Sequence, residues 1–542
     1  MRKSSFIEGT LIATLAIVFT KILGMFYVIP FYAMVGVQGS ALYAYAYNIY
    51  VIFLDISSAG LPIAVSKIIN EYNTLGMMDA KIRTYKICKR IMTFIAVIIF
   101  LILFVFASTI AQILLGDLSG GNTIYDVTLA IRSVSFAILV VPFLSVTKGY
   151  LQGHKIINVS SFSQVIEQVV RISIILIGCY LILKVFHGTV RSAVCVSVFA
   201  AFVSGVIAYL YVKRKIDKDD VIRLDKKYKR DHVSDQEITK KLFSYAIPFI
   251  IINIVGSLYN FIDMTLVLRT MNYIGLDVKD VEFISSSIST WAPKINMVIT
   301  SIAMGMSTSL IPTIVSAWTL NDKNEINKSF NQAIQLILLV SVPMALGIFL
   351  LNKPIWSIFY GYNEIGSRIL SLYVFSGLLL NIYMTTESTL QGLNKFHLVY
   401  VSTIVGFVCN AILDVPLMLL FHSIGFYPYL GSITATIIGY CLSILIAFVG
   451  LKKEWKLHYR KTIEIGFKIM IPSICMVGIV LLMMHFIPYN VYSRLSCVVY
   501  VVIHAICGAI VYILLCFKLG IVDQIIGKGN VKSFIKKLTL GK

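Results

Sequence analysis

The feature that most constrains this chain is a succession of apolar segments, each long enough to cross a membrane as a helix. About 20 apolar residues span the roughly 30 Å of hydrocarbon in a bilayer, and only a helix satisfies its own backbone hydrogen bonds there. Fourteen such segments are predicted, over residues 6–36, 43–72, 88–115, 127–151, 159–184, 191–212, 242–269, 285–317, 327–351, 365–391, 397–421, 429–451, 462–487 and 491–517. The sequence therefore predicts an all-α polytopic membrane protein with fourteen transmembrane helices.

The placement of charge predicts which side of the membrane each loop faces. The 542 residues include 47 Lys and Arg but only 26 Asp and Glu, for a net charge of +21. Such basicity is also found in nucleic-acid-binding proteins, but here most basic residues fall in alternate loops, as expected for cytoplasmic loops of a membrane protein. We therefore predict cytoplasmic N- and C-termini and no nucleic-acid partner. The outer loops are short, which leaves no room for an external catalytic domain.

A polar segment over residues 213–241 divides the chain. It carries both signs of charge and lacks apolar periodicity, which is typical of a solvated cytoplasmic linker. The predicted organisation is a six-helix lobe over residues 1–212, this linker, and a second six-helix lobe over residues 242–451. Two additional helices and a basic cytoplasmic tail follow over residues 452–542.

Two short matches recur at corresponding places in the two six-helix sets. Pro62-Ile-Ala-Val-Ser66 lies in the second predicted span, and Pro312-Thr-Ile-Val-Ser316 lies in the eighth. Leu-Gln-Gly follows the fourth span, over residues 151–153, and the tenth, over residues 390–392. Because each motif occurs at the same position in the order of spans in both sets, the matches indicate an internal duplication. Since six is even, both copies would insert in the same orientation, with a substrate site between them.

Several polar residues inside the predicted spans are candidates for substrate binding. A charge at the bilayer centre costs about 2.5 to 3.5 kcal/mol and needs a partner or water. Lys21 lies near the middle of the first span, and Lys294 and Ser301 share one stripe of the span over residues 285–317. Asn296 lies on a weaker polar row opposite. This pattern is typical of a helix that faces a wet cavity. Snorkelling of Lys294 to the outer surface is the alternative.

The carboxylates inside the spans allow two interpretations. Each could bind a coupling proton or Na⁺, or could have a structural role by pairing with a buried lysine or capping a broken helix. They are Asp55, Asp263, Glu387 and Asp414. Glu167 and Arg171 are four residues apart, so they are predicted to neutralise each other on one helix face.

Prolines and glycines in the spans are candidates for bends. A proline removes a backbone hydrogen bond, and the bend that results either permits a rocking motion or only shapes packing. The hinge or structural candidates are Gly24, Pro30, Pro62, Gly153, Pro312 and Gly392. The nine cysteines and eight histidines show no metal-binding spacing, so neither a metal site nor a catalytic residue is predicted.

These residues together resemble a known family, the multidrug/oligosaccharidyl-lipid/polysaccharide (MOP) flippase superfamily. Within it, the chain is similar to the lipid II flippases and stage V sporulation protein B-like proteins of Gram-positive bacteria. The resemblance is carried by residues 19–24 with Pro30, residues 60–67 with Glu71, residues 291–316, and the two Leu-Gln-Gly turns. It extends over nearly the whole chain.

The resemblance implies two six-helix lobes in a V around a cationic cavity that opens alternately to each side of the membrane. Lys21 and Lys294 match two basic positions of that cavity. The chain departs from Gram-negative members, which have Arg-Asp where this chain has Tyr27-Val28 and paired arginines where it has Leu54-Asp55. The last two helices resemble those that form a groove for the lipid tail.

The function implied is a flippase of the bacterial plasma membrane, not an enzyme. It would move an undecaprenyl-diphosphate-linked cell-wall precursor from the inner to the outer leaflet, and lipid II is the first candidate for this precursor. It would act as a monomer among membrane lipids, without a cofactor, driven by the membrane potential, H⁺ or Na⁺. The alternatives are a flippase for another lipid-linked polysaccharide unit and a cation-coupled multidrug exporter that binds its cation at Asp55 or Asp263. A membrane enzyme and a non-transporting scaffold are rivals of other classes.

Overall fold

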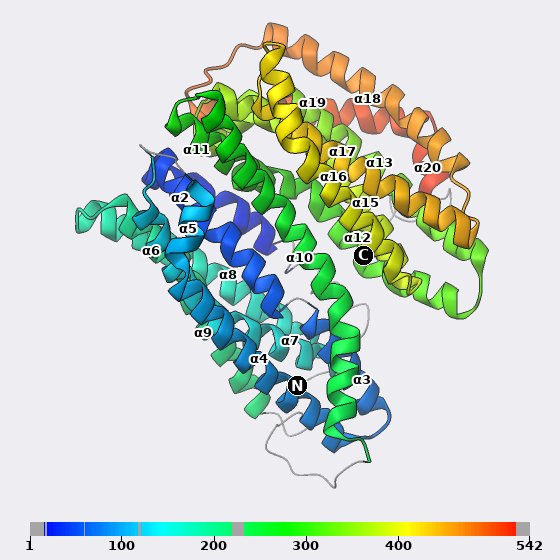
Figure 1. Ribbon diagram of the computed structural model, residues 1–542. Helices are drawn as coiled ribbons and strands as arrows, with labels where there is room; N and C mark the ends of the chain where they lie inside the picture. The colour runs from blue at the N-terminus through cyan, green and yellow to red at the C-terminus, as the bar shows by residue number, and fades with distance from the viewer. Residues whose placement is uncertain (1–15, 17–18, 59, 117–120, 219–231, 527–542) are drawn as a thin grey trace. The chain divides into compact units, whose positions relative to one another are not determined.

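Every regular element in the described part of the chain is a helix (Figure 1). The computed structural model describes residue 16 and residues 19–58, 60–116, 121–218 and 232–526. Twelve helical segments among them are long and apolar enough to cross a membrane. This confirms the prediction of an all-α, multi-pass membrane protein. The number of fourteen spans stays a prediction, since residues 6–15 and 17–18 of the first predicted span lie outside the described residues and the helix over residues 292–319 is not among the twelve segments.

The first part of the chain is broken where its sequence disfavours a continuous helix. Residues 19–26 are helical, and α2 (Val28–Ser58) begins after Tyr27. Pro30 has no N–H to donate to the preceding turn, which favours a break at this point. Within α2, Gly36 leaves the helical region with φ 66°. Glycine reaches this backbone conformation without a Cβ penalty, and the break coincides with the predicted end of the first span.

Three further spans, predicted as continuous, are divided. α3 (Leu61–Thr74) follows α2, and α5 (Ala107–Leu115) follows α4 (Met78–Val105). The fourth span consists of α6 (Ile124–Ser135), the 3₁₀ turn η1 (Phe136–Leu139) and α7 (Val141–Gly153). Pro62 lies in the first turn of α3, where a missing N–H costs no hydrogen bond. Pro62 therefore starts a helix at an interruption between helices.

The predicted linker over residues 213–241 is helical at both ends. α8 (Ile157–Tyr180) continues into the π-helix η2 (Leu181–Val185), and α9 (Val190–Asp217) extends into the linker. α10 (Asp235–Ile274) begins within it, at a capping box. The Ser234 hydroxyl accepts from the Glu237 N–H at 3.2 Å, and the Glu237 carboxylate accepts from the Ser234 N–H at 3.1 Å. The Ser-x-x-Glu spacing is a helix-start signal that the sequence interpretation missed.

The chain divides into two compact units at Trp291 and Ala292. The first unit ends with α10, α11 (Val278–Ser286) and the π-helix η3 (Ser287–Trp291). Its main core cluster is formed by apolar side chains of α3, α4, α7, α9 and α10. By their contacts, α10 and α11 therefore belong to the first unit. The sequence instead places them in the second lobe, which is predicted to begin at residue 242. The division into two six-helix lobes stays a prediction.

The second unit contains nine helices within the described residues. They are α12 (Ala292–Thr319), α13 (Lys323–Leu350), α14 (Asn352–Tyr360), α15 (Glu364–Gly392), α16 (Phe396–Ser423), α17 (Tyr429–Trp455), α18 (Arg460–Phe486), α19 (Arg494–Lys518) and α20 (Ile521–Ile526). The helices α18 and α19 pack against each other, and α18 also packs against α13 (Figure 1). A core cluster of α13, α18, α19 and α20 side chains holds these additional helices to the unit.

The helices that carry the two repeated motifs pack on each other within each unit. In the first unit, α3 packs on α7, and a Cβ added at Gly149 would overlap the Pro62 carbonyl oxygen. In the second unit, α12 packs on α15, and a Cβ at Gly392 would lie 2.9 Å from the Ile314 side chain. Each Pro-x-x-Val-Ser helix therefore packs on the helix that ends in Leu-Gln-Gly.

The turns after the two Leu-Gln-Gly motifs also have the same backbone conformation. Lys155 and Asn394 are left-handed, with φ 61° and 58°. In each turn the next N–H donates back to the carbonyl of the motif's leucine, at 3.0 Å after the first motif and 2.8 Å after the second. The corresponding helix pairs and the matching turns support the internal duplication inferred from the sequence.

Candidate functional site

Three of the predicted site residues lie in the first unit. Lys21 is half-buried on the helical segment 19–26, and Asp55 is half-buried on α2. The Asp55 carboxylate accepts a hydrogen bond from the hydroxyl of Ser257 on α10. Asp263, also on α10, is 4% exposed. Asp55 therefore contacts α10, the helix that also carries Asp263.

The helix of Lys21 lies against α8. A Cβ added at Gly24 would lie 3.2 Å from the Gln168 side-chain nitrogen. Gly24, a hinge candidate, is therefore a position of close helix approach. Lys21 precedes it by one helical turn, so both residues lie on the same face of their segment.

A cluster of charges on α7 and α8 extends the ion pair predicted from the sequence. The Arg171 guanidinium donates to Glu167 at 2.5 Å, which confirms that pair. The Lys148 ammonium also donates to Glu167, at 3.0 Å. The sequence interpretation missed Lys148, although a lysine inside the fourth predicted span was a signal for a buried charge.

Aromatic side chains gather where α2 meets the end of the first unit. The hydroxyls of Tyr27 and Tyr43 are 3.3 Å apart. The Tyr43 ring stacks on Tyr47 at 5.8 Å and on Trp291 at 6.1 Å between centroids. Arg171 interacts electrostatically with the Tyr43, Tyr47 and Tyr50 hydroxyls. The spacing of Tyr43 and Tyr47 by four residues was a signal for a polar and aromatic helix face.

Three predicted site residues lie in the second unit, on α12. Lys294 and Ser301 are half-buried, and the Ser301 hydroxyl donates to the Val298 carbonyl at 2.8 Å. Asn296 is 4% exposed and is packed so closely on Gly377 of α15 that a Cβ there would overlap its amide. In this structure Asn296 therefore lies in a helix–helix contact. The side chain of Pro312, a hinge candidate on the same helix, lies outside the described part.

The polar row of α12 that includes Asn296 is matched by polar residues of α15. The Asn381 amide donates to the Ile299 carbonyl at 2.7 Å and to the Ser341 hydroxyl at 3.0 Å. The Ser388 and Ser307 hydroxyls are 2.8 Å apart. These bonds compensate the burial of polar groups at the contact in part. The side-chain oxygens of Asn296 and Asn381 are buried and have no hydrogen-bond partner among the described residues. The row predicted as the weaker polar face of α12 thus lies in a helix–helix contact, and the role of Asn296 in substrate binding stays a prediction.

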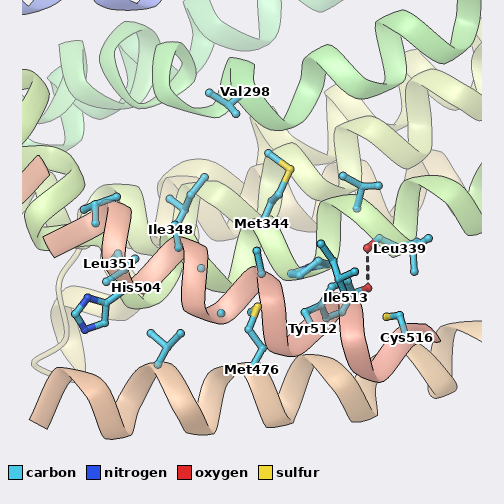
Figure 2. A pocket seen from close by; sticks show the side chains of 18 of the residues that line it. Val298, Leu339, Met344, Ile348, Leu351, Met476, His504, Tyr512, Ile513 and Cys516 are labelled. Atoms are coloured by element: carbon cyan, nitrogen blue, oxygen red, sulfur yellow. Dashed lines mark hydrogen bonds between the residues drawn. The ribbon is translucent and has the colours of Figure 1, made fainter. Parts of the chain in front are cut away.

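An apolar cavity lies within the second unit and is lined mainly by α13 and α19, with Met476 and Val480 of α18 (Figure 2). Its volume is about 580 Å³. Figure 2 shows Met344, Ile348 and Met476 lining the cavity, and the bond from the Tyr512 hydroxyl to the Leu339 carbonyl, 2.6 Å long, at one end. Such a lining suits a hydrocarbon chain and offers few polar groups that would hold water.

One buried carboxyl group lies outside the candidate membrane spans. Glu282 on α11 is 2% exposed. It accepts hydrogen bonds from the Asn122 backbone N–H at 2.8 Å and from the Asn122 side-chain amide at 3.0 Å. Burial raises the pKa of Glu282, and the bonds from Asn122 oppose this shift in part.

Comparisons with known families agree with this architecture. A family model described as "Polysaccharide biosynthesis protein" matches residues 6–318, and one described as "MatE" matches residues 248–415. In Bacillus subtilis (strain 168), the protein named "Lipid II flippase MurJ" is 32% identical over 548 residues, which cover 98% of this chain and 99% of that protein. "Stage V sporulation protein B" of the same organism is 24% identical over 413 residues, 75% of this chain and 76% of that protein.

Solved structures show the same fold at lower sequence identity. The structure titled "Lipid II flippase MurJ, inward closed conformation" has a TM-score of 0.69 at 17% identity and covers 94% of this chain and 99% of its own. An inward-facing multidrug resistance MATE family transporter has a TM-score of 0.64 at 14% identity, over 80% and 94% of the two chains. The chain therefore belongs to the MOP superfamily, in the branch of polysaccharide biosynthesis proteins that includes the lipid II flippases.

Proposed function

We propose that this protein is a flippase that moves lipid II from the inner to the outer leaflet of a bacterial plasma membrane. The observation that carries the proposal is the 32% identity to a lipid II flippase over almost the full length of both chains. The relatives and structures described above are named as flippases and transporters or for sporulation, and no enzyme is among them. The likeness to multidrug transporters concerns the fold alone.

The physical task of such a flippase is to carry a diphosphate and sugars through hydrocarbon. A bare diphosphate cannot enter a low-dielectric medium, so the protein must supply cations and water along the path. Lys21 in the first unit and Lys294 in the second are the cations proposed to contact the headgroup during transport. The apolar cavity along α13, α18 and α19 is proposed to hold part of the polyprenyl tail.

The orientation, assembly state and driving force are part of the proposal. Both termini are placed in the cytoplasm, and a monomer is taken as the transporting unit. Asp55 and Asp263 are proposed as binding residues for a coupling H⁺ or Na⁺, with the membrane potential as the third candidate driving force. Measuring flipping across vesicles at set Na⁺ gradients, pH gradients and potentials would separate the three.

The role of the two lysines is tested by Lys21→Ala and Lys294→Ala. Loss of one charged hydrogen bond is expected to weaken lipid II binding by about 1.5 to 3 kcal/mol, with normal membrane levels and little or no complementation of a flippase-depleted strain. The variants Lys21→Arg and Lys294→Arg are expected to retain part of the activity, because the charge stays while the donor geometry changes.

Lys328→Ala, a substitution of an exposed lysine on α13, is the matched control and should behave as wild type. If each buried lysine only neutralises a carboxylate, its loss would instead lower membrane levels, and removal of the carboxylate would restore them. Wild-type lipid II binding by the double variant Lys21→Ala/Lys294→Ala would refute the cationic site.

A further inference from the structure

The charge cluster on α7 and α8 carries more positive than negative charge. Lys148 and Arg171 each bond to a different oxygen of the same carboxylate, Glu167, at 3.0 and 2.5 Å. Two cations therefore share one anion. The hydroxyls of Tyr27, Tyr43, Tyr47 and Tyr50 also interact electrostatically with Arg171. Among the described residues, Glu167 is the carboxylate that forms an ion pair with either cation. The cluster thus has a net charge of +1.

The Arg171 guanidinium also has hydrogen-bonding capacity that the protein does not use. Within the described residues, its Nε is buried and has no hydrogen-bond partner. A buried donor without an acceptor is unfavourable, and more so on a charged group. The Lys148, Glu167 and Arg171 side chains are nevertheless 17%, 14% and 23% exposed, so a ligand can reach part of the cluster although the Arg171 Nε itself is buried. These features fit an anion that binds and leaves.

The position of the cluster decides which anions can reach it. α8 begins at Ile157, and at 1.5 Å per residue Glu167 lies about 15 Å and Arg171 about 21 Å along the helix. This depth is inside the predicted hydrocarbon region, where surface phosphates of ordinary membrane lipids do not extend. An anion at this depth has to be one that is carried into the membrane.

The cluster also lies on the side of α8 that meets the helix of Lys21. Gly24 approaches Gln168, Lys21 lies one turn before Gly24, and Arg171 lies one turn after Gln168. Since both helices are predicted to run from inside to outside, Lys21 and Arg171 are separated by about two turns, roughly 10 Å along the helix axes. Two cationic points at this spacing can contact two anionic groups of one ligand.

We propose that Lys148 and Arg171 form a second anion subsite within the first unit, which binds a phosphate or carboxylate group of the transported lipid-linked precursor. Arginine suits this role because its planar fork binds either anion through two parallel bonds. Glu167 occupies donors of both cations when the ligand is absent. The proposal rests on the proposed flippase function and adds Lys148 and Arg171 to the proposed binding residues.

The test measures binding of three lipids to the purified full-length protein in nanodiscs at fixed ionic strength. The lipids are lipid II, undecaprenyl diphosphate and uncharged undecaprenol. Arg171→Gln and Lys148→Gln are each expected to weaken lipid II binding by about 10- to 100-fold, with undecaprenol binding unchanged. Glu167→Gln frees both cations and is expected to bind lipid II at least as tightly as wild type. Lys184→Gln, an exposed lysine just after α8, is the matched control.

Comparison of lipid II with undecaprenyl diphosphate identifies which anionic group binds at the subsite. An equal loss for undecaprenyl diphosphate and lipid II would place the phosphates at the subsite, whereas a loss for lipid II alone would place a carboxylate of its headgroup there. Wild-type binding by both Arg171→Gln and Lys148→Gln, or equal weakening by Lys184→Gln or Glu167→Gln, would overturn the subsite. A wild-type protein that binds none of the charged lipids would instead reject the proposed function. Arg171→Lys, which keeps the charge but not the two parallel bonds, should retain part of the binding and serves if Arg171→Gln does not fold.

Discussion

At the residue scale, Glu282 is a carboxyl group whose protonation is linked to folding. Burial raises its pKa in the folded protein above the value in the unfolded chain, which is about 4.3. The folded state therefore prefers the protonated form. The contribution of this preference to stability is fully present below the unfolded pKa and is lost as the pH rises through the folded pKa. We expect the thermal midpoint of the wild type to fall over this pH range more steeply than that of Glu282→Gln.

Thermal unfolding of both proteins in detergent, followed from pH 4 upward, measures this difference. Glu464→Gln on α18 is a suitable control because its carboxylate is 54% exposed and its loss should leave the pH dependence of the wild type in place. Parallel curves for the wild type and Glu282→Gln at all pH values would contradict the assignment.

At the element scale, the packing of α3 on α7 depends on the absence of a side chain at Gly149. A Cβ at this position would overlap the backbone of Pro62, and backbone atoms cannot move aside cheaply. Gly149→Ala is therefore expected to lower the free energy of unfolding by about 1 to 3 kcal/mol, the cost of overpacking a tight contact. The measurement is the thermal midpoint in detergent, together with the yield of folded protein.

Gly256→Ala on α10 is the matched control, since no atom lies within 4 Å of the added Cβ. Alanine is the better helix former, so this variant should be as stable as the wild type or slightly more stable. The prediction fails if the two alanine variants have the same midpoint.

At the scale of the whole molecule, the internal duplication requires the two Leu-Gln-Gly turns to face the same side of the membrane. Gly153 and Gly392 themselves are buried, but Lys155 and Asn394 in the turns are exposed. In a protein without its nine native cysteines, Lys155→Cys and Asn394→Cys should both react with a membrane-impermeant maleimide only after the cytoplasmic side is opened. Labelling of one turn from the outside would be incompatible with a duplicated six-helix unit.

Reporter fusions test the topology independently. A fusion after Lys218, at the end of α9, is expected on the cytoplasmic side, and one after Gly361, between α14 and α15, on the outside. The reason is the concentration of basic residues in alternate loops. Fusions that report the same side would exclude the predicted number of spans.

Much of the fold could be predicted from the sequence because it depends on local properties. Length and apolarity of a segment are sufficient for a membrane helix, since no other structure satisfies the backbone in hydrocarbon. The Glu167–Arg171 pair followed from helical spacing alone. The two repeated motifs were visible as short matches. The breaks at Tyr27, Gly36 and Gly60 were only partly foreseen, because apolarity continues across them.

The sequence by itself determined that this protein is a helical membrane protein with a duplicated pattern and charges inside its spans. Each of these features depends only on residues that are close together in the sequence. Only the tertiary structure decided the partners. Lys148 joins Glu167 from a neighbouring helix, and Asn122 reaches Glu282 across 160 positions of sequence. Asn296, predicted in a cavity, packs on Gly377. Such pairings depend on which helix faces meet in three dimensions. Periodicity along one helix does not indicate which residues of a neighbouring helix will pack against it.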